Sequence, residues 1–136
     1  MIPSDMGRFL GSFNANPPAS QSIIENVVRL VPGVLPEGYM RFLQFANGGE
    51  GFIGANTYAI LWRIEELLSM NREHQVSEYA PGLFVFGSDG GGEAFAFDLR
   101  SQPASIVSVP FVGMALDLIS PIAATFEGFL ENSFKA

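Results

Sequence analysis

Residues 83–99 read LFVFGSDGGGEAFAFDL, and the fold prediction starts from this stretch. At both of its ends, large aromatic residues alternate with smaller ones at the two-residue period of a β-strand. The alternation groups the phenylalanines in pairs, with Phe84 and Phe86 on one face and Phe95 and Phe97 on another. The middle, residues 88–93, contains three glycines, which can adopt positive φ without steric cost. The stretch therefore predicts an antiparallel hairpin with a long glycine-rich tip, whose phenylalanines need a cover.

Segments on both sides of the hairpin are expected to supply that cover and to extend the sheet. Apolar residues at three- and four-residue spacing predict helices, and short aliphatic or aromatic runs between turn residues predict strands. The predicted helices are residues 20–31, ended by Pro32 and Gly33, residues 36–46, ended by Asn47, Gly48 and Gly49, residues 63–70, and a last segment opened by Ser120 and Pro121. The predicted strands outside the hairpin are residues 51–54, 57–62 and 105–110, and residues 71–81 are expected to form a polar loop. The first two helices are expected to pair as an αα-hairpin.

The order of these elements favours the α+β class. Strands that follow one another and are joined by turns form a mainly antiparallel sheet, and helices near the chain ends pack mainly on one face of it. Residues 1–19 carry prolines and glycines around a small apolar cluster. We interpret them as an N-terminal arm that packs on the domain or on a second subunit, with residues 14–19 as a linker. Residues 20–136 are predicted to form a single domain, which is long enough to bury one core.

The composition of the 136-residue chain argues against several classes of function. A formal net charge of −7 disfavours nucleic-acid binding, which needs a concentrated basic surface. The chain has no cysteine, which excludes disulfides and thiolate chemistry and fits a reducing compartment. We find no signal peptide or membrane span, so a cytoplasmic location and no membrane partner are expected. Because 48% of the residues are hydrophobic and thirteen are phenylalanine, we also expect an exposed apolar patch that serves homo-oligomerisation or partner docking.

The reactive side chains form no catalytic or metal-binding pattern in the sequence. His74, the only histidine, lies in a charged stretch without a nucleophile motif, so a solvated surface position is favoured over a general base. One histidine per chain cannot supply a histidine pair for a metal. Five carboxylates could serve glycoside hydrolysis, but nothing in the sequence places two of them across a cleft. They are Glu50, Glu65, Glu66, Asp89 and Glu93. We therefore expect no catalytic residue, no metal and no cofactor.

The glycine-rich tip and two aromatic residues allow alternative interpretations. The tip could hold an anion on its backbone amides, but a phosphate loop has another spacing and precedes a helix, and Asp89 and Glu93 would repel a phosphate. A calcium loop requires a spacing of acidic residues that is absent here. A simple hairpin connection is therefore favoured. Tyr58 and Trp62 could stack a sugar or a base, but a strand that leads into an apolar helix favours core positions for both.

Three blocks of the chain together resemble the SUKH superfamily and, within it, the Smi/Knr-like group. The first block is residues 35–43, LPEGYMRFL, closed by the NGG of residues 47–49, and it is similar to the proline-started helix of that family. The second is residues 87–93, GSDGGGE, which run into Phe97 and Asp98 like the family's glycine-rich hairpin. The third is residues 124–131, ATFEGFLE, similar to its closing helix, while residues 61–67, LWRIEEL, occupy its strand-to-helix junction. The resemblance covers residues 20–132.

The resemblance implies an α+β domain with the SUKH (Smi/Knr-like) fold and no enzymatic activity. Bacterial members are regarded as immunity proteins that bind and neutralise polymorphic toxins, often nucleases, and fungal relatives are interaction modules in cell-wall signalling. Our leading hypothesis is therefore an immunity protein, with a regulatory or scaffolding module as the alternative and an enzyme as a third hypothesis. The acidic residues Glu50, Asp89 and Glu93 are the predicted partner-binding residues, because they would steer a basic, nuclease-type toxin toward the hairpin tip and the first strand.

Overall fold

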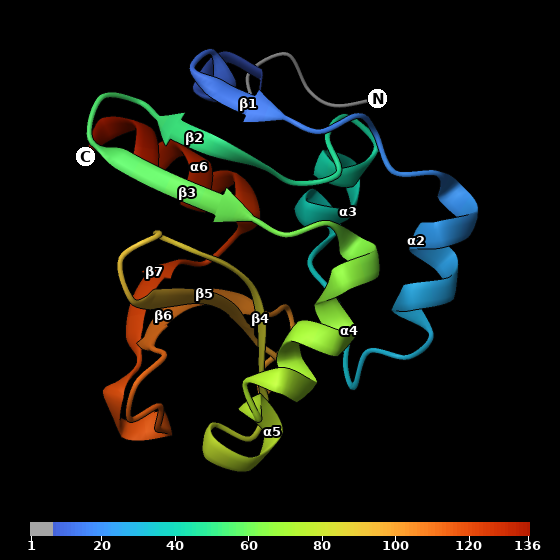
Figure 1. Ribbon diagram of the computed structural model, residues 1–136, viewed down its shortest axis with the longest axis vertical. Coiled ribbons are helices and arrows are strands. Elements are labelled where there is room, and N and C mark those ends of the chain that lie inside the picture. Colours follow the sequence, from blue (N-terminus) through green and yellow to red (C-terminus); the bar gives the residue numbers. More distant parts are fainter. Residues whose placement is uncertain (1–6) are drawn as a thin grey trace.

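In the computed structural model, which describes residues 7–136, seven strands form one antiparallel sheet whose strand order follows the sequence (Figure 1). The strands are β1 (Phe13–Ala15), β2 (Gly49–Ile53), β3 (Thr57–Leu61), β4 (Leu83–Ser88), β5 (Glu93–Asp98), β6 (Ser105–Pro110) and β7 (Ser120–Ala123). The helices are α2 (Gln21–Val28), α3 (Glu37–Leu43), α4 (Ile64–Glu73), α5 (Val76–Tyr79) and α6 (Phe126–Lys135), with short 3-10 turns at η1 (Arg8–Leu10) and η2 (Leu116–Leu118). The predicted α+β class with a mainly antiparallel sheet is confirmed.

The hairpin of β4 and β5 lies in the middle of the sheet, as predicted. Phe84 pairs with Phe97, and a β-bulge between Val85 and Gly87 shifts the register toward the tip. Residues that pair directly across two strands point to the same side of a sheet. All four hairpin phenylalanines therefore enter the same core, and the two pairs do not lie on separate faces. The ring of Phe86 stacks on that of Phe97, with 4.2 Å between ring centroids and 13° between ring planes.

Helices α3 and α6 cover the phenylalanine face and complete the main core. The fully buried aromatic side chains of these helices are Tyr39, Phe42, Phe126 and Phe129. Phe129 meets Phe86 edge-on at 5.6 Å between ring centroids, and Tyr39 meets Phe97 at 4.8 Å in a tilted arrangement. Such geometries add to the free energy that is gained by removing the rings from water. The expected helical cover of the hairpin is confirmed.

A second, smaller core lies on the opposite face of β4, β5 and β6. Its buried residues are Val76, Ala80, Leu83, Val85, Ala94, Ala96, Val107, Val109 and Met114. Helix α5 supplies Val76, the residue after it is Ala80, and the segment of residues 111–119 packs against the rest. The central strands are thus buried on both faces, whereas the side chains that β2 and β3 present to this second face remain partly exposed. Only about half of the second face is covered.

Helix α2 packs beside α4 and does not form the predicted αα-hairpin with α3 (Figure 1). Ser20 caps α2, because its Oγ accepts a hydrogen bond from the Ile23 N–H at 3.3 Å. Helix α3 ends at Leu43, and Gly48 follows with a φ of +73°, a conformation that favours glycine. The prediction that the NGG segment stops this helix was wrong, because the helix already ends at Leu43 with a right-handed Gln44, and Gly48 directly precedes β2. Both helices are shorter than their apolar periodicity suggests.

The segment predicted as a polar loop, residues 71–81, is largely helical. Helix α4 continues to Glu73, and α5 follows after Gln75, which adopts a left-handed φ of 54°. Val76 and Ala80 are buried in the second core. The loop prediction was wrong because most side chains of this segment are polar and face the solvent. Only two apolar side chains, Val76 and Ala80, anchor it, and they are too few to give a helical pattern in the sequence.

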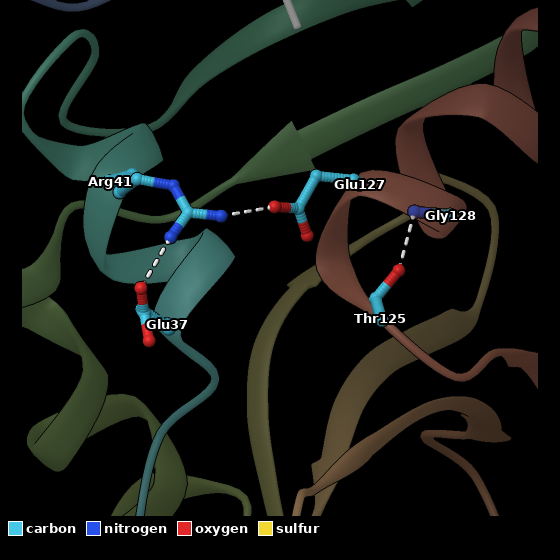
Figure 2. Close-up of polar contacts among 5 residues, drawn as sticks. All are labelled: Glu37, Arg41, Thr125, Glu127 and Gly128. Carbon is cyan, nitrogen blue, oxygen red and sulfur yellow. Dashed lines mark hydrogen bonds and ion pairs between the residues drawn. The ribbon is translucent and has the colours of Figure 1, made fainter. Parts of the chain in front are cut away.

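Ser120 and Pro121 begin the edge strand β7 and not the last helix, so this helix prediction was wrong. A proline is tolerated at a sheet edge because an edge residue can leave its backbone nitrogen unpaired. Thr125 caps the last helix instead, with its Oγ1 accepting from the Gly128 N–H at 2.9 Å (Figure 2). A serine-proline pair fits a helix start and an edge strand equally well, and the pairing of β7 with β6 decides between them.

The described part of the N-terminal arm is built into the sheet. Strand β1 pairs with β2, with Asn14 opposite Glu50, so residues 14 and 15 belong to a strand and not to a linker. Phe9, Leu10 and Phe13 are buried in the main core. The aromatic residues of the arm therefore pack on the same chain, which was the first of the two alternatives. The first six residues of the predicted arm lie outside the described residues.

Candidate protein-interaction face

Charged residues of the first and third blocks join two helices on the covered side of the sheet (Figure 2). Arg41 of α3 donates to Glu37 at 2.7 Å and to Glu127 of α6, which lies 86 positions away in the sequence. The Glu127 carboxylate rests on Gly38, where a Cβ atom would overlap it. These residues border a hollow of about 300 Å³ in which the cation and the carboxylates already pair with one another. The arrangement fastens α3 to α6.

Asn47, the first residue of the NGG segment, caps helix α4. Its Oδ1 accepts from the Ile64 N–H at 2.8 Å, and its Nδ2 donates to the Glu65 carboxylate at 2.7 Å. The side chain is buried, and the helix that it caps begins 17 residues later. Sequence reasoning assigned the segment only a helix-stopping role, because a cap supplied from another element leaves no local signal.

The side chains that β1, β2 and β3 present to the second face of the sheet form what we call the open face. Strand pairing sets Asn14 beside Glu50, Glu50 beside Ile60, and Phe52 beside Tyr58. Trp62 follows the same alternation just after β3. The open face thus consists of Asn14, Glu50, Phe52, Tyr58, Ile60 and Trp62, all of them at least partly exposed. Phe52 has an exposed fraction of 45%, and its ring meets Tyr58 edge-on at 5.2 Å.

Glu50, the first predicted partner-binding residue, lies at the centre of the open face. The Tyr58 hydroxyl donates a hydrogen bond to its carboxylate, and this bond is the main cause that raises the pKa of Tyr58. The Tyr58 ring also contacts the hairpin tip, since a Cβ atom at Gly90 would stand 3.3 Å from it. The structure therefore brings Glu50 next to the tip. The prediction of a core position for Tyr58 was wrong, because its strand faces solvent on this side.

The other two predicted residues lie at the hairpin tip. Asp89 shapes the tip, with its Oδ1 accepting from the N–H groups of Gly91 at 2.7 Å and Glu93 at 3.1 Å. Glu93 begins β5, where Ala94 belongs to the second core and Phe95 to the main core. By strand alternation Glu93 therefore points to the helix-covered side. Glu50 belongs to the open face and Asp89 lies beside it at the tip, whereas Glu93 points to the other side of the sheet.

Trp62 extends the open face toward the second core through two further rings. His74 is exposed, as predicted, and its ring is stacked on Trp62 with 6.1 Å between centroids and 4° between planes. Phe111 lies 4.7 Å from His74. Trp62 is half-buried and packs against both cores, so the predicted core position is only partly correct. Sequence reasoning missed Phe52 and Phe111, because neither belongs to a pattern until the sheet is formed.

The described residues show other features that bear on the kind of site. Within residues 7–136 no three histidine or acidic side chains gather as potential metal ligands. None of the helices in that range is both long and apolar enough to cross a membrane. The open face combines three aromatic rings with one carboxylate and one side-chain amide, and aromatic side chains are enriched at protein interfaces. Fold and face together define an α+β protein with a surface suited to contact another protein.

Comparison with known families agrees with this class. A model of the SMI1 / KNR4 family (SUKH-1) matches residues 18–132, and the chain belongs to this family. Members of the family are generally non-catalytic immunity or regulatory domains, so the family supports a protein partner for this chain. A comparison with curated proteins found no match.

Proposed function

We propose that the chain is a cytoplasmic immunity protein, which binds a bacterial toxin through the open face and the adjoining hairpin tip and so blocks the toxin's active site. The observation that carries this proposal is the open face itself. It presents the rings of Phe52, Tyr58 and Trp62 around the carboxylate of Glu50 in a family of protein-binding domains. Aromatic side chains with polar groups at their edges are the residues that most often dominate binding energy at protein interfaces.

The negative charge of the chain supports the proposal that its partner is a basic protein. The chain carries a net charge of −7, with Glu50 on the open face and Asp89 at the tip beside it. Glu93 points to the other side of the sheet, but steering acts over about 10 Å at moderate salt, so it still contributes to the field around the tip. Acidic residues in such positions raise the association rate with a basic protein more than they lengthen the life of the complex.

Co-expression with the product of the neighbouring gene, scored as rescue from its toxicity and as co-purification, tests the proposal. We expect the chain to rescue growth and to co-purify with the toxin. The variant Glu50→Lys, Asp89→Asn, Glu93→Lys should lose much of both effects, because it removes the negative charges that attract a basic toxin. Asparagine at position 89 keeps the oxygen acceptor that shapes the tip, so the hairpin should remain folded. The matched control is Glu25→Lys, Asp117→Asn, Glu73→Lys, which changes the charge equally at exposed positions away from the tip.

The outcomes separate the proposal from its alternative. If the two triple variants protect equally well, Glu50, Asp89 and Glu93 do not belong to the toxin-binding site. Failure of the unmodified chain to protect against any neighbouring gene product would favour the second family role, a regulatory or scaffolding module. In that case the open face would serve a resident protein partner.

A further inference from the structure

One end of the open face contains a hollow of about 280 Å³, where β1, β2, β3 and the start of α4 meet. The lining residues that matter here are Asn14, Asn16, Glu50, Trp62, Arg63 and Glu66. Small-molecule sites usually measure ~300–1,000 Å³, so this hollow suits one side chain of a partner better than a whole cofactor.

Two carboxylates reach the hollow from different elements, and each has one oxygen to spare. The Tyr58 hydroxyl occupies one oxygen of Glu50, and the backbone N–H of Arg63 occupies Oε1 of Glu66 at 3.1 Å. In the part of the chain that the structure describes, neither second oxygen takes part in a hydrogen bond, and neither does the Asn14 amide. Acceptors on two walls of one hollow match a group that donates several N–H bonds in different directions.

The geometry points to this hollow as the docking site for an arginine side chain of a basic partner protein. A guanidinium is planar, donates in several directions and stacks on aromatic rings, so it can use the two carboxylates and the Trp62 indole together. A lysine ammonium is a point charge and gains less from this arrangement. The assignment rests on the proposed function, because it names the chemical group by which the proposed partner is held.

The charges of the hollow make the assignment testable in both directions. Glu50 and Glu66 attract a guanidinium, whereas Arg63, an exposed residue that also lines the hollow, opposes it. Removing the two carboxylates should weaken binding, and removing Arg63 should strengthen it. Glutamine at positions 50 and 66 keeps an acceptor for Tyr58 and for the Arg63 N–H, so the local structure is retained.

The experiment is a fluorescence titration of the full chain with an oligo-arginine peptide of about nine residues, with an oligo-lysine peptide of the same length as comparison. Trp62 is the only tryptophan, so its emission reports directly on the hollow. We expect the arginine peptide to bind about fivefold more tightly than the lysine peptide, and Glu50→Gln/Glu66→Gln to weaken it about tenfold. Arg63→Gln should strengthen it about threefold, and the matched control Glu25→Gln/Glu73→Gln should change it less than about twofold.

Three results would overturn the assignment: no change in Trp62 emission, equal affinity for both peptides, or equal weakening by both double variants. Strengthening by Arg63→Gln keeps the test decisive even where the double variant is poorly folded. Because the titration needs no toxin, it fails independently of the proposed function. If the chain protects against a toxin but binds both peptides equally well, the proposed function stands and the arginine site is refuted. If the chain prefers the arginine peptide but protects against no toxin, the arginine site stands and the immunity function is refuted.

Discussion

The two faces of the sheet differ in what their aromatic side chains do. On the covered face, Phe86 is fully buried and meets rings from α3 and α6. On the open face, Phe52 is 45% exposed, and its ring meets that of Tyr58 across the strand pair. The charged residues differ in the same way, since Arg41 is paired with two carboxylates, whereas Glu50 keeps a free oxygen. The comparison teaches that the first and third blocks that mark the family hold the helices on the covered face, and that the exposed aromatic side chains of β2 and β3 lie on the other face.

The comparison is tested most strongly by truncating one aromatic residue on each face. Phe86→Ala should lower the free energy of unfolding by about 3–5 kcal/mol, because it leaves a cavity among packed rings. Phe52→Ala should lower it by less than about 1 kcal/mol, because the ring is already partly in water. Urea unfolding followed by circular dichroism measures both values. Similar losses for the two variants would mean that the open face is part of the core and not an interaction surface.

The variant Asn47→Ala tests whether the NGG segment stabilises the fold or belongs to the interaction surface. Asn47→Ala removes the buried acceptor of the Ile64 N–H and the donor to Glu65, and we expect a loss of about 2 kcal/mol. Asn26→Ala, at an exposed position of α2, is the control and should cost less than about 0.5 kcal/mol. The same urea titrations provide the values. If Asn47→Ala kept full stability but abolished partner binding, the segment would belong to the interaction surface instead.

The two tyrosines Tyr39 and Tyr58 sharpen the contrast between the faces. The Tyr39 hydroxyl is buried without a hydrogen-bond partner among the described residues, so Tyr39→Phe should stabilise the protein by about 1 kcal/mol. Burial raises the pKa of Tyr39 above its ordinary value of 10.0, so only the unfolded chain ionises at this residue just above that pH. Above about pH 10 the wild type therefore loses stability relative to Tyr39→Phe. The difference in the free energy of unfolding between the two proteins widens from pH 7 to about pH 11.

Tyr58→Phe is the matched change on the open face. It removes only an exposed hydrogen bond to Glu50 and should alter stability by less than about 0.5 kcal/mol. Thermal unfolding of both variants at the two pH values gives the comparison. A destabilising Tyr39→Phe at pH 7 would show that the buried hydroxyl has a partner after all.

The smallest expected effect on stability comes from breaking the ion pair between Arg100 and Asp98. Asp98 lies on the second-core side of β5. Arg100 donates to both of its carboxylate oxygens at 2.9 Å, and these bonds lower the pKa of Asp98 below its ordinary value of 3.8. The ionised pair therefore stabilises the fold above that value, and the contribution is lost as the pH falls through the lowered pKa. Arg100→Gln should cost less than about 1 kcal/mol at pH 7, because the arginine is partly exposed.

The difference between wild type and Arg100→Gln should shrink as the pH is lowered from 7 to about 2. Arg29→Gln serves as control, since the Arg29 guanidinium donates to the uncharged Asn26 amide. Its effect should not depend on pH in this range. A difference for Arg100→Gln that stays constant down to the lowest pH would mean that packing of its stem on Gly82, and not the ion pair, is what the arginine contributes.

Several parts of the fold follow from local sequence patterns. The two-residue alternation around the glycine-rich tip predicts the β4–β5 hairpin, and the apolar spacing after Pro36 predicts α3, although that helix ends at Leu43, before the NGG segment. Residues 71–81 could not be assigned in this way, because two anchoring side chains, Val76 and Ala80, give too short an apolar pattern for a helix. The start of the last helix was misplaced for a similar reason, since Ser120 and Pro121 are compatible with two kinds of element.

The candidate site was predictable only in part. Glu50, Asp89 and Glu93 were selected by their charge and by their place near the hairpin tip and the first strand. Glu93 points to the other side of the sheet from Glu50, and the role of the three residues in partner binding remains a prediction. Trp62, Phe52 and Glu66 gave no signal that set them apart from core aromatic residues or from an ordinary helix start. Their place beside Glu50 depends on the pairing of β2 with β3 and on the capping of α4 by Asn47, which join residues distant in sequence.

The sequence by itself determined the class of fold, the hairpin at its centre and the family, because alternation, helical spacing and glycine placement are local properties of the chain. Only the tertiary structure decided which face of the sheet is closed and which stays open. Helices α2, α3, α4 and α6, together with η1, form the main core on one face, while α5 and residues 111–119 are too short to cover more than the central strands of the other. The surface that is left over is set by how far the covering elements reach, and no single stretch of sequence contains that information.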